Sequence, residues 1–167
     1  MGLKIFGRNF ATVCMLGMAS IGICNGAVNV ACVGNSITEG YGIWDEKKYP
    51  QHLQEMLGDG YVVTNFGASS MTFANPGDDK SQIKNQSYWN REHFKNALAS
   101  KPNIVVIELG TNDSKFFMQN YPEIGAYNSM SQQYSKAKLL KDYEALIDTF
   151  AHAETAPEIF ATLQPYS

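Results

Sequence analysis

Two kinds of apolar pattern alternate along this chain, one continuous and one periodic. The clearest continuous run is Ile-Val-Val-Ile-Glu-Leu at 104–109, and less uniform runs occupy 28–33, 61–64 and 158–163. Short runs rich in β-branched residues are typical of strands. A nearly unbroken aliphatic run such as 104–109 indicates a central strand that is covered on both faces.

Segments with apolar residues three or four positions apart separate these runs. There are three such segments: residues 49–57, a stretch that carries Phe94, Ala97 and Leu98, and residues 139–150. This spacing predicts amphipathic helices. Pro50 suits the first turn of the first helix and Gly58 suits its end. Asn90 is expected to cap the second helix.

The remaining segments lack a period. Residues 75–87 are polar and rich in turn formers, which predicts a surface loop. Residues 115–136 are interpreted as a long excursion with room for one short helix. Its aromatic residues either form a platform for a sugar or pack the excursion against the domain; they are Phe116, Phe117, Tyr121, Tyr127 and Tyr134.

The alternation of strands and helices predicts an α/β fold with a parallel sheet and helices on both faces. Three predicted strands end in small or polar clusters, at 34–36, 67–70 and 110–113. Parallel strands bring their carboxyl ends to one edge of the sheet, where ligands bind in open α/β folds. The sequence therefore predicts a polar site at this edge.

The size and charge of the chain limit the number of its domains and the kinds of partner it can bind. Its 167 residues suffice for one domain, and the net charge is −3. There is no basic run of the kind that nucleic-acid binding requires, so no nucleic-acid partner is expected. Nothing in the composition indicates an oligomeric state.

The first 27 residues resemble an export signal. Lys4 and Arg8 precede an uncharged apolar stretch at 10–24, and Ala27 offers a small residue for cleavage. The sequence thus predicts a signal peptide at 1–27, a domain at 28–167, and a secreted or periplasmic protein with no stable membrane insertion after cleavage. Cleavage after Ala19 and an uncleaved anchor are the alternatives. Cleavage after Ala27 leaves Cys32 as a single thiol, expected in the core.

Three residues at the strand ends have the chemistry of acyl transfer. Ser36 follows the first strand and is the candidate nucleophile, although a serine there also suits a helix cap. The N–H of Gly67 and the side-chain amide of Asn112 are candidate donors to a tetrahedral oxyanion. Asn112 with Asp113 alternatively forms only a turn.

Other chemistry finds little support in the sequence. Asp148 and His152 lie four apart on one helix face and are interpreted as a surface pair, and His52 and His93 also as structural or surface residues. No metal-ligand spacing, phosphate loop or dinucleotide motif occurs, so no cofactor is expected.

Together, Gly34-Asn35-Ser36-Ile37-Thr38, Asn65-Phe66-Gly67 and Gly110-Thr111-Asn112-Asp113 resemble the first three sequence blocks of the SGNH, or GDSL-type, hydrolases. This resemblance implies a three-layer α/β/α flavodoxin-like fold and hydrolysis of esters. It implies that Ser36 is the nucleophile and that the N–H groups of Ser36 and Gly67 and the side chain of Asn112 form the oxyanion hole. The chain is most similar to secreted members that remove acetyl groups from carbohydrate, which implies a small-molecule or polysaccharide ester as substrate.

The chain departs from this family in two places. Asn35 replaces the usual aspartate and is expected to brace the turn before Ser36. The final Asp-x-x-His block is absent, so the resemblance implies an incomplete domain that lacks the last strand and helix, with the catalytic histidine and aspartate beyond Ser167. A non-catalytic carbohydrate-binding domain and an inactive gene fragment are the alternatives.

Overall fold

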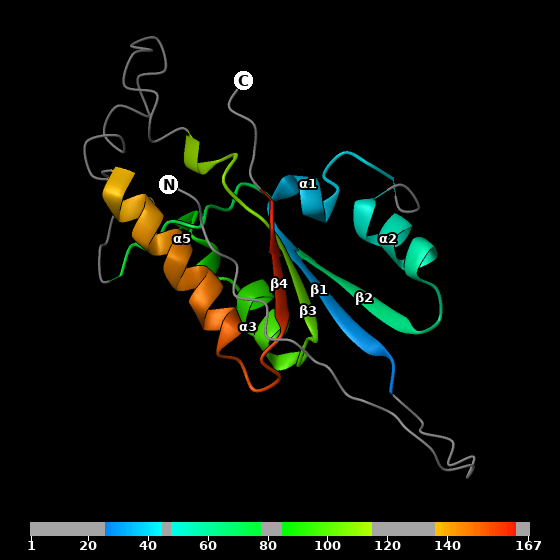
Figure 1. The fold of residues 1–167 in the computed structure, drawn as a ribbon. Helices are drawn as coiled ribbons and strands as arrows, with labels where there is room; N and C mark the ends of the chain where they lie inside the picture. The colour runs from blue at the N-terminus through cyan, green and yellow to red at the C-terminus, as the bar shows by residue number, and fades with distance from the viewer. Residues whose placement is uncertain (1–25, 45–47, 78–84, 115–135, 163–167) are drawn as a thin grey trace, which may run out of the picture.

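The computed structural model describes residues 26–44, 48–77, 85–114 and 136–162 (Figure 1). The predicted signal segment, apart from its last two residues, lies outside the described residues. So do the excursion at 115–135, with its aromatic residues, and the chain after Thr162.

The strands form one parallel sheet, as the sequence predicts. In space their order is β2-β1-β3-β4, and every adjacent pair is parallel. The strands are β1 (Val28–Gly34), β2 (Tyr61–Gly67), β3 (Ile104–Glu108) and β4 (Glu158–Ala161). The central position predicted for 104–109 is confirmed, because Val105 and Ile107 are fully buried between β1 and β4. The last strand ends at Ala161, two residues before its predicted end.

The helices begin close to the predicted positions. They are α1 (Ser36–Glu39), α2 (Tyr49–Leu57), α3 (Glu92–Ala99) and α5 (Lys136–Ala151), with a 3-10 helix, η3, at Tyr88–Asn90. Pro50 lies in the first turn of α2 and Gly58 ends it with φ of 73°, so both predictions are confirmed. The prediction that Asn90 caps a helix is wrong: Asn90 belongs to η3, and Arg91 is the N-cap of α3.

The physical reason for this shift is the burial of Tyr88. Its side chain is fully buried, and its hydroxyl donates a 2.6 Å hydrogen bond to the carbonyl of Phe66. The chain therefore makes one tight turn at Tyr88–Asn90 to insert the ring before α3 begins. The ring of Phe94, in α3, packs edge-on against Tyr88.

The helices cover the two faces of the sheet. Figure 1 shows α3 and α5 on one face and α1 and α2 on the other, next to β1 and β2. The main core lies on the α3–α5 side, where side chains from β1 and β3 meet both helices; it includes Ala31, Val33, Val105, Ile107, Ala97, Leu146 and Phe150. This layering confirms the predicted α/β architecture.

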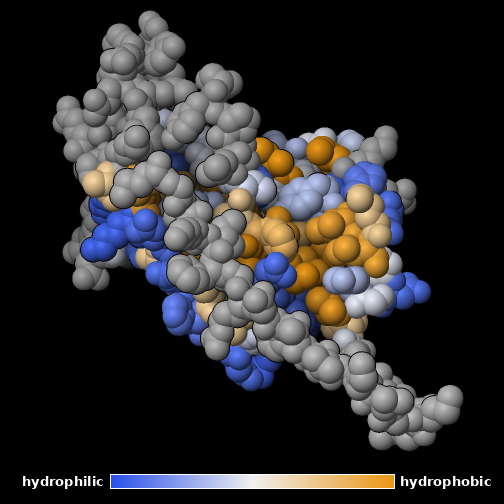
Figure 2. All heavy atoms as spheres, in the orientation of Figure 1, coloured by the Kyte–Doolittle hydropathy of each residue, from blue (hydrophilic) through white to orange (hydrophobic). Residues whose placement is uncertain are grey.

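Some apolar surface stays open on the other face of the sheet. Ile159 packs on the core, whereas its neighbour Phe160 is half exposed. Figure 2 shows hydrophobic residues at the surface over the sheet in the same view. Within the described residues, no helix is both long enough and apolar enough to cross a membrane.

Candidate active site

Ser36 lies at the junction between β1 and α1. Asn35 is the N-cap of α1, and its side-chain Oδ1 accepts a 2.9 Å hydrogen bond from the N–H of Ile37. The prediction that Asn35 braces this turn is confirmed. Ser36 is the first residue of α1, at the carboxyl edge of the sheet, and is partly exposed.

A very close approach of backbone and side chain fixes this junction. A Cβ atom at Gly34 would lie 1.9 Å from Oγ1 of Thr38 and 2.7 Å from the carbonyl oxygen of Glu108. The Thr38 hydroxyl donates a 3.1 Å hydrogen bond to Oε2 of Glu108, so α1 is tied to the end of β3. Only glycine fits at position 34, because any side chain would push α1 and Ser36 away from the sheet.

Gly67 lies directly beside α1. It pairs laterally with Gly34, and a Cβ atom at Gly67 would lie 2.1 Å from the backbone nitrogen of Glu39. Its N–H donates a 2.8 Å hydrogen bond to Oδ1 of Asn65, whose amide in turn donates to the carbonyl of Thr38 at 2.8 Å. The role of Gly67 as an oxyanion donor stays a prediction, and it requires Asn65 to release this N–H.

Asn112 joins the end of β3 to the segment that follows β2. Its side-chain nitrogen donates a 2.9 Å hydrogen bond to the carbonyl of Met71. An amide group carries two hydrogens, so the second is available to another acceptor. Asn112 as a whole is only partly buried.

The sheet register places these residues at one edge. Gly34 pairs with Gly67 on one side and with Glu108 on the other. Ser36 comes two residues after Gly34 and Asn112 comes four residues after Glu108, so both follow the carboxyl ends of adjacent strands, and Gly67 is itself the last residue of β2. The predicted gathering of polar residues at one edge is therefore observed.

Asp113 also lies at this edge, and the sequence indicated no function for it apart from the turn with Asn112. Its side chain is buried, and its two oxygens accept the N–H groups of Phe73 at 3.1 Å and Ala74 at 3.0 Å. Burial raises the pKa of Asp113 to about 7, although these two hydrogen bonds lower it in part. Asp113 therefore anchors the segment after β2; its position next to Asn112 was the only signal in the sequence.

A second carboxylate extends this anchor. Asp142, in α5, accepts a 2.9 Å hydrogen bond from the N–H of Asn75. Lys138 donates to Asp142 at 2.7 Å and to the carbonyl of Asn75 at 2.8 Å. Residues 71–75, which we name the anchored segment, are thus held by the end of β3 and by α5.

The three histidines lie at the surface and are not hydrogen-bonded to Ser36. His52 has its ring Nδ1 3.4 Å from Oε2 of Glu55, and the His152 ring contacts the carbonyl of Asp148 at 2.8 Å. His93 is exposed in the first turn of α3. The interpretation of all three as structural or surface residues is confirmed.

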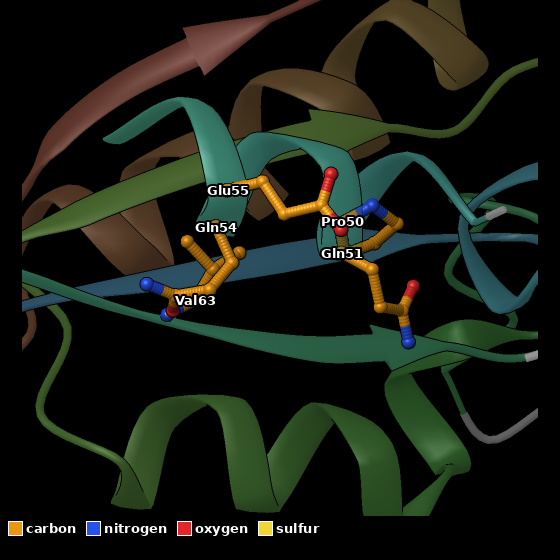
Figure 3. A pocket seen from close by; sticks show the side chains of 5 residues that line it. All are labelled: Pro50, Gln51, Gln54, Glu55 and Val63. Carbon is orange, nitrogen blue, oxygen red and sulfur yellow. The ribbon is translucent and has the colours of Figure 1, made fainter. Parts of the chain in front are cut away.

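Two further features lie apart from this edge. Cys32 is buried, and burial raises the pKa of its thiol to about 11, which confirms the core role predicted for it. A shallow pocket of about 270 Å³ lies between α2 and β2 and is lined by Pro50, Gln51, Gln54, Glu55 and Val63 (Figure 3). Its lining contains none of the candidate site residues.

Among the described residues there is no cluster of three histidine, cysteine or acidic side chains suited to a metal ion.

Comparison with known proteins gives both a family and a fold. Residues 32–166 match the model of the GDSL-like lipase/acylhydrolase family. The acetylxylan esterase of Xylanibacter ruminicola is 50% identical over 109 residues, which make up 64% of this chain and 20% of that protein. The chain thus matches about a fifth of the length of this relative.

Solved structures support the same fold at lower identity. AlinE4, an SGNH-hydrolase family esterase, gives a TM-score of 0.53 at 20% identity, over 81% of this chain and 58% of AlinE4. A carbohydrate acetylesterase family member from Sinorhizobium meliloti gives a TM-score of 0.51 at 20% identity, over 80% of this chain and 61% of that one. These likenesses confirm the SGNH-hydrolase fold expected from the three sequence blocks.

Proposed function

Because this chain belongs to the GDSL-like lipase/acylhydrolase family, we propose that it is a serine esterase domain that removes small acyl groups, chiefly acetyl, from carbohydrate. The observation that carries this proposal is the position of Ser36. It is a partly exposed serine on the first turn of α1, at the edge of the sheet where the partly exposed Asn112 has a second amide hydrogen besides the one it donates to Met71.

The reaction follows from these groups. The Ser36 hydroxyl attacks the ester carbonyl and passes its proton to a general base, since a neutral serine is a weak nucleophile. The carbonyl oxygen becomes an oxyanion and is stabilised by the second hydrogen of the Asn112 amide and by backbone N–H groups. The alcohol of the sugar leaves with a proton, and water then releases the acyl group from Ser36.

The choice of carbohydrate as substrate rests on the acetylxylan esterase of Xylanibacter ruminicola. That protein is named an acetylxylan esterase, and it shares half of its residues with this chain over the matched region. Acetylated xylan is therefore the polymer with which to test this chain first. Export across the membrane is part of the proposal, and it rests on the charged start and apolar stretch of residues 1–27.

The test is ester hydrolysis by the full-length protein, with 4-nitrophenyl acetate and acetylated xylan as substrates. Ser36→Ala should lower kcat/KM at least about a thousandfold, because a covalent nucleophile has no substitute. Asn112→Ala should lower it about 100- to 1,000-fold. Ser100→Ala is the matched control, because the Ser100 hydroxyl donates to the carbonyl of Ala97 at the end of α3, far from this edge. Unchanged hydrolysis by Ser36→Ala would refute the assignment.

A second candidate function is a carbohydrate-binding domain without catalysis. The observation that favours it is that two of the three proposed oxyanion donors already have acceptors, Asn65 for Gly67 and the carbonyl of Met71 for Asn112. Binding of xylan without release of acetate by the full-length protein would support this function, and measurable turnover would eliminate it.

A further inference from the structure

The exposed hydrophobic side chains are concentrated directly after Ser36. Among the described residues, eight large hydrophobic side chains are exposed, and four of them fall within residues 37–44. These four are Ile37 at 50%, Tyr41 at 78%, Ile43 at 45% and Trp44 at 90% exposure. The other four are distributed singly over α2, β2, α5 and β4.

Hydrogen bonds hold the backbone of this region from Ser36 to Ile43. The N–H groups of Gly40 and Tyr41 both donate to the carbonyl of Ser36 at 2.9 Å, and the N–H of Ile43 donates to that of Gly40 at 3.0 Å. Gly40 ends α1 in the left-handed conformation, with φ of 77°. A Cβ atom there would lie 2.3 Å from the Lys48 side chain, so this lysine packs over the turn.

Tyr41 and Trp44 lie on the loop that follows α1, the helix whose first residue is the candidate nucleophile. We name residues 40–44 the aromatic loop. Figure 1 shows that the chain leaves α1 for α2 at the end of the molecule where the strands have their carboxyl ends. The aromatic loop thus begins four residues after Ser36, at the same end of the sheet.

The chemistry of the loop favours a sugar over a lipid surface. Tyrosine and tryptophan combine an apolar ring with a polar group, which suits a partner that is apolar on one face and hydrated at its rim. A pyranose ring has this character, since its C–H groups form an apolar face and its hydroxyls lie around the edge. An anionic membrane surface is instead bound by clusters of lysine and arginine. In the sequence, Trp44 is followed by Asp45, Glu46, Lys47 and Lys48, whose charges cancel, so the loop carries no basic cluster of this kind.

We propose that Tyr41 and Trp44 form a stacking surface for the sugar rings of a polysaccharide substrate beside Ser36. This inference rests on the proposed function for its substrate class, and it adds the residues that select a polymer over a small ester. Exposed aromatic side chains give large contact areas at little cost in side-chain entropy, because they have only two rotatable bonds. A polysaccharide partner would explain why the apolar rings of Tyr41 and Trp44 are exposed to water.

The first test compares two substrates in the full-length protein. For Trp44→Ala and Tyr41→Ala, the ratio of kcat/KM on acetylated xylan to kcat/KM on 4-nitrophenyl acetate should fall about tenfold, because stacking on an aromatic ring is lost. Trp44→Phe should restore part of this ratio. Met56→Ala is the matched control, since Met56 is 84% exposed on α2, outside the loop. A ratio unchanged in both aromatic variants would overturn the proposal.

The second test does not depend on catalysis. Binding of deacetylated xylan is measured by affinity electrophoresis in the Ser36→Ala background, with and without Trp44→Ala. Binding that weakens about tenfold on loss of Trp44 supports the stacking surface even if Ser36 proves not to be the nucleophile. Equal binding by both proteins overturns it. The proposal is also overturned if Trp44→Ala changes only binding to vesicles, which would assign the loop to a lipid surface. The same holds if Trp44→Ala changes only self-association, which would assign the loop to a second copy of the chain.

Discussion

Replacing Asp113 by alanine removes the side chain that holds the anchored segment in place. Asp113 is 1% exposed, and its oxygens accept the N–H groups of Phe73 and Ala74. Leaving a buried backbone donor unpaired costs about 1–3 kcal/mol, so the loss of both acceptors should lower the free energy of unfolding by about 2–6 kcal/mol. Asp113→Asn keeps one acceptor and should cost about half as much.

The same carboxyl makes stability depend on pH. Burial raises the pKa of Asp113 from 3.8 to about 7 in the folded protein, so between these values the folded state holds a proton that the unfolded state has released. The free energy of unfolding should therefore fall as pH rises from about 4 to about 7, by at most about 4 kcal/mol from this group. Asp113→Asn does not titrate, so its stability should lack this decrease.

Urea unfolding of the full-length protein at pH 4.5, 6 and 7.5 measures both effects. Tryptophan fluorescence is a suitable signal, because the indole N–H of Trp89 donates a 2.9 Å hydrogen bond to the carbonyl of Phe73 in the anchored segment. Asp148→Ala is the control, since Asp148 is exposed on α5 and should change stability by less than about 0.5 kcal/mol. The reasoning is wrong if Asp113→Ala matches the wild type within that margin, or if Asp113→Asn keeps the same dependence on pH.

Two further substitutions test the edge strand and the contact beneath α1. Gln54→Leu removes a side chain that donates to the carbonyls of Gly58 and Tyr61 and accepts the N–H of Val63 on the outer edge of β2. It should lower the free energy of unfolding by about 1.5–4 kcal/mol in urea and increase aggregation in light scattering, and unchanged values in both would contradict this role. Gly67→Ala places a Cβ atom 2.1 Å from the backbone of α1 and should cost at least about 1–3 kcal/mol. Gly60→Ala, which meets nothing within 4 Å, is its control, and equal stability of the two variants would exclude the predicted clash.

Local patterns in the sequence were enough to predict the sheet. The aliphatic run at 104–109 predicted the central strand, because a strand covered on both faces needs apolar side chains on both sides. Ser36 and Asn112 were selected because small and polar residues at strand ends gather at one edge in a parallel sheet. Asn90 shows the limit of this approach, since its capping pattern was local while the burial of Tyr88 depended on β2.

The sequence by itself thus predicted the succession of strands and helices along the chain, the edge of the candidate site and the candidate nucleophile. Only the tertiary structure decided which donors are occupied, which carboxylate anchors residues 71–75 and which aromatic rings face solvent. The physical reason is distance along the chain: Asp113 meets Phe73 and Ala74 across 40 and 39 residues, and Asn112 meets Met71 across 41. Strand and helix patterns repeat within a few residues, whereas hydrogen bonds between such distant groups depend on how the whole domain packs.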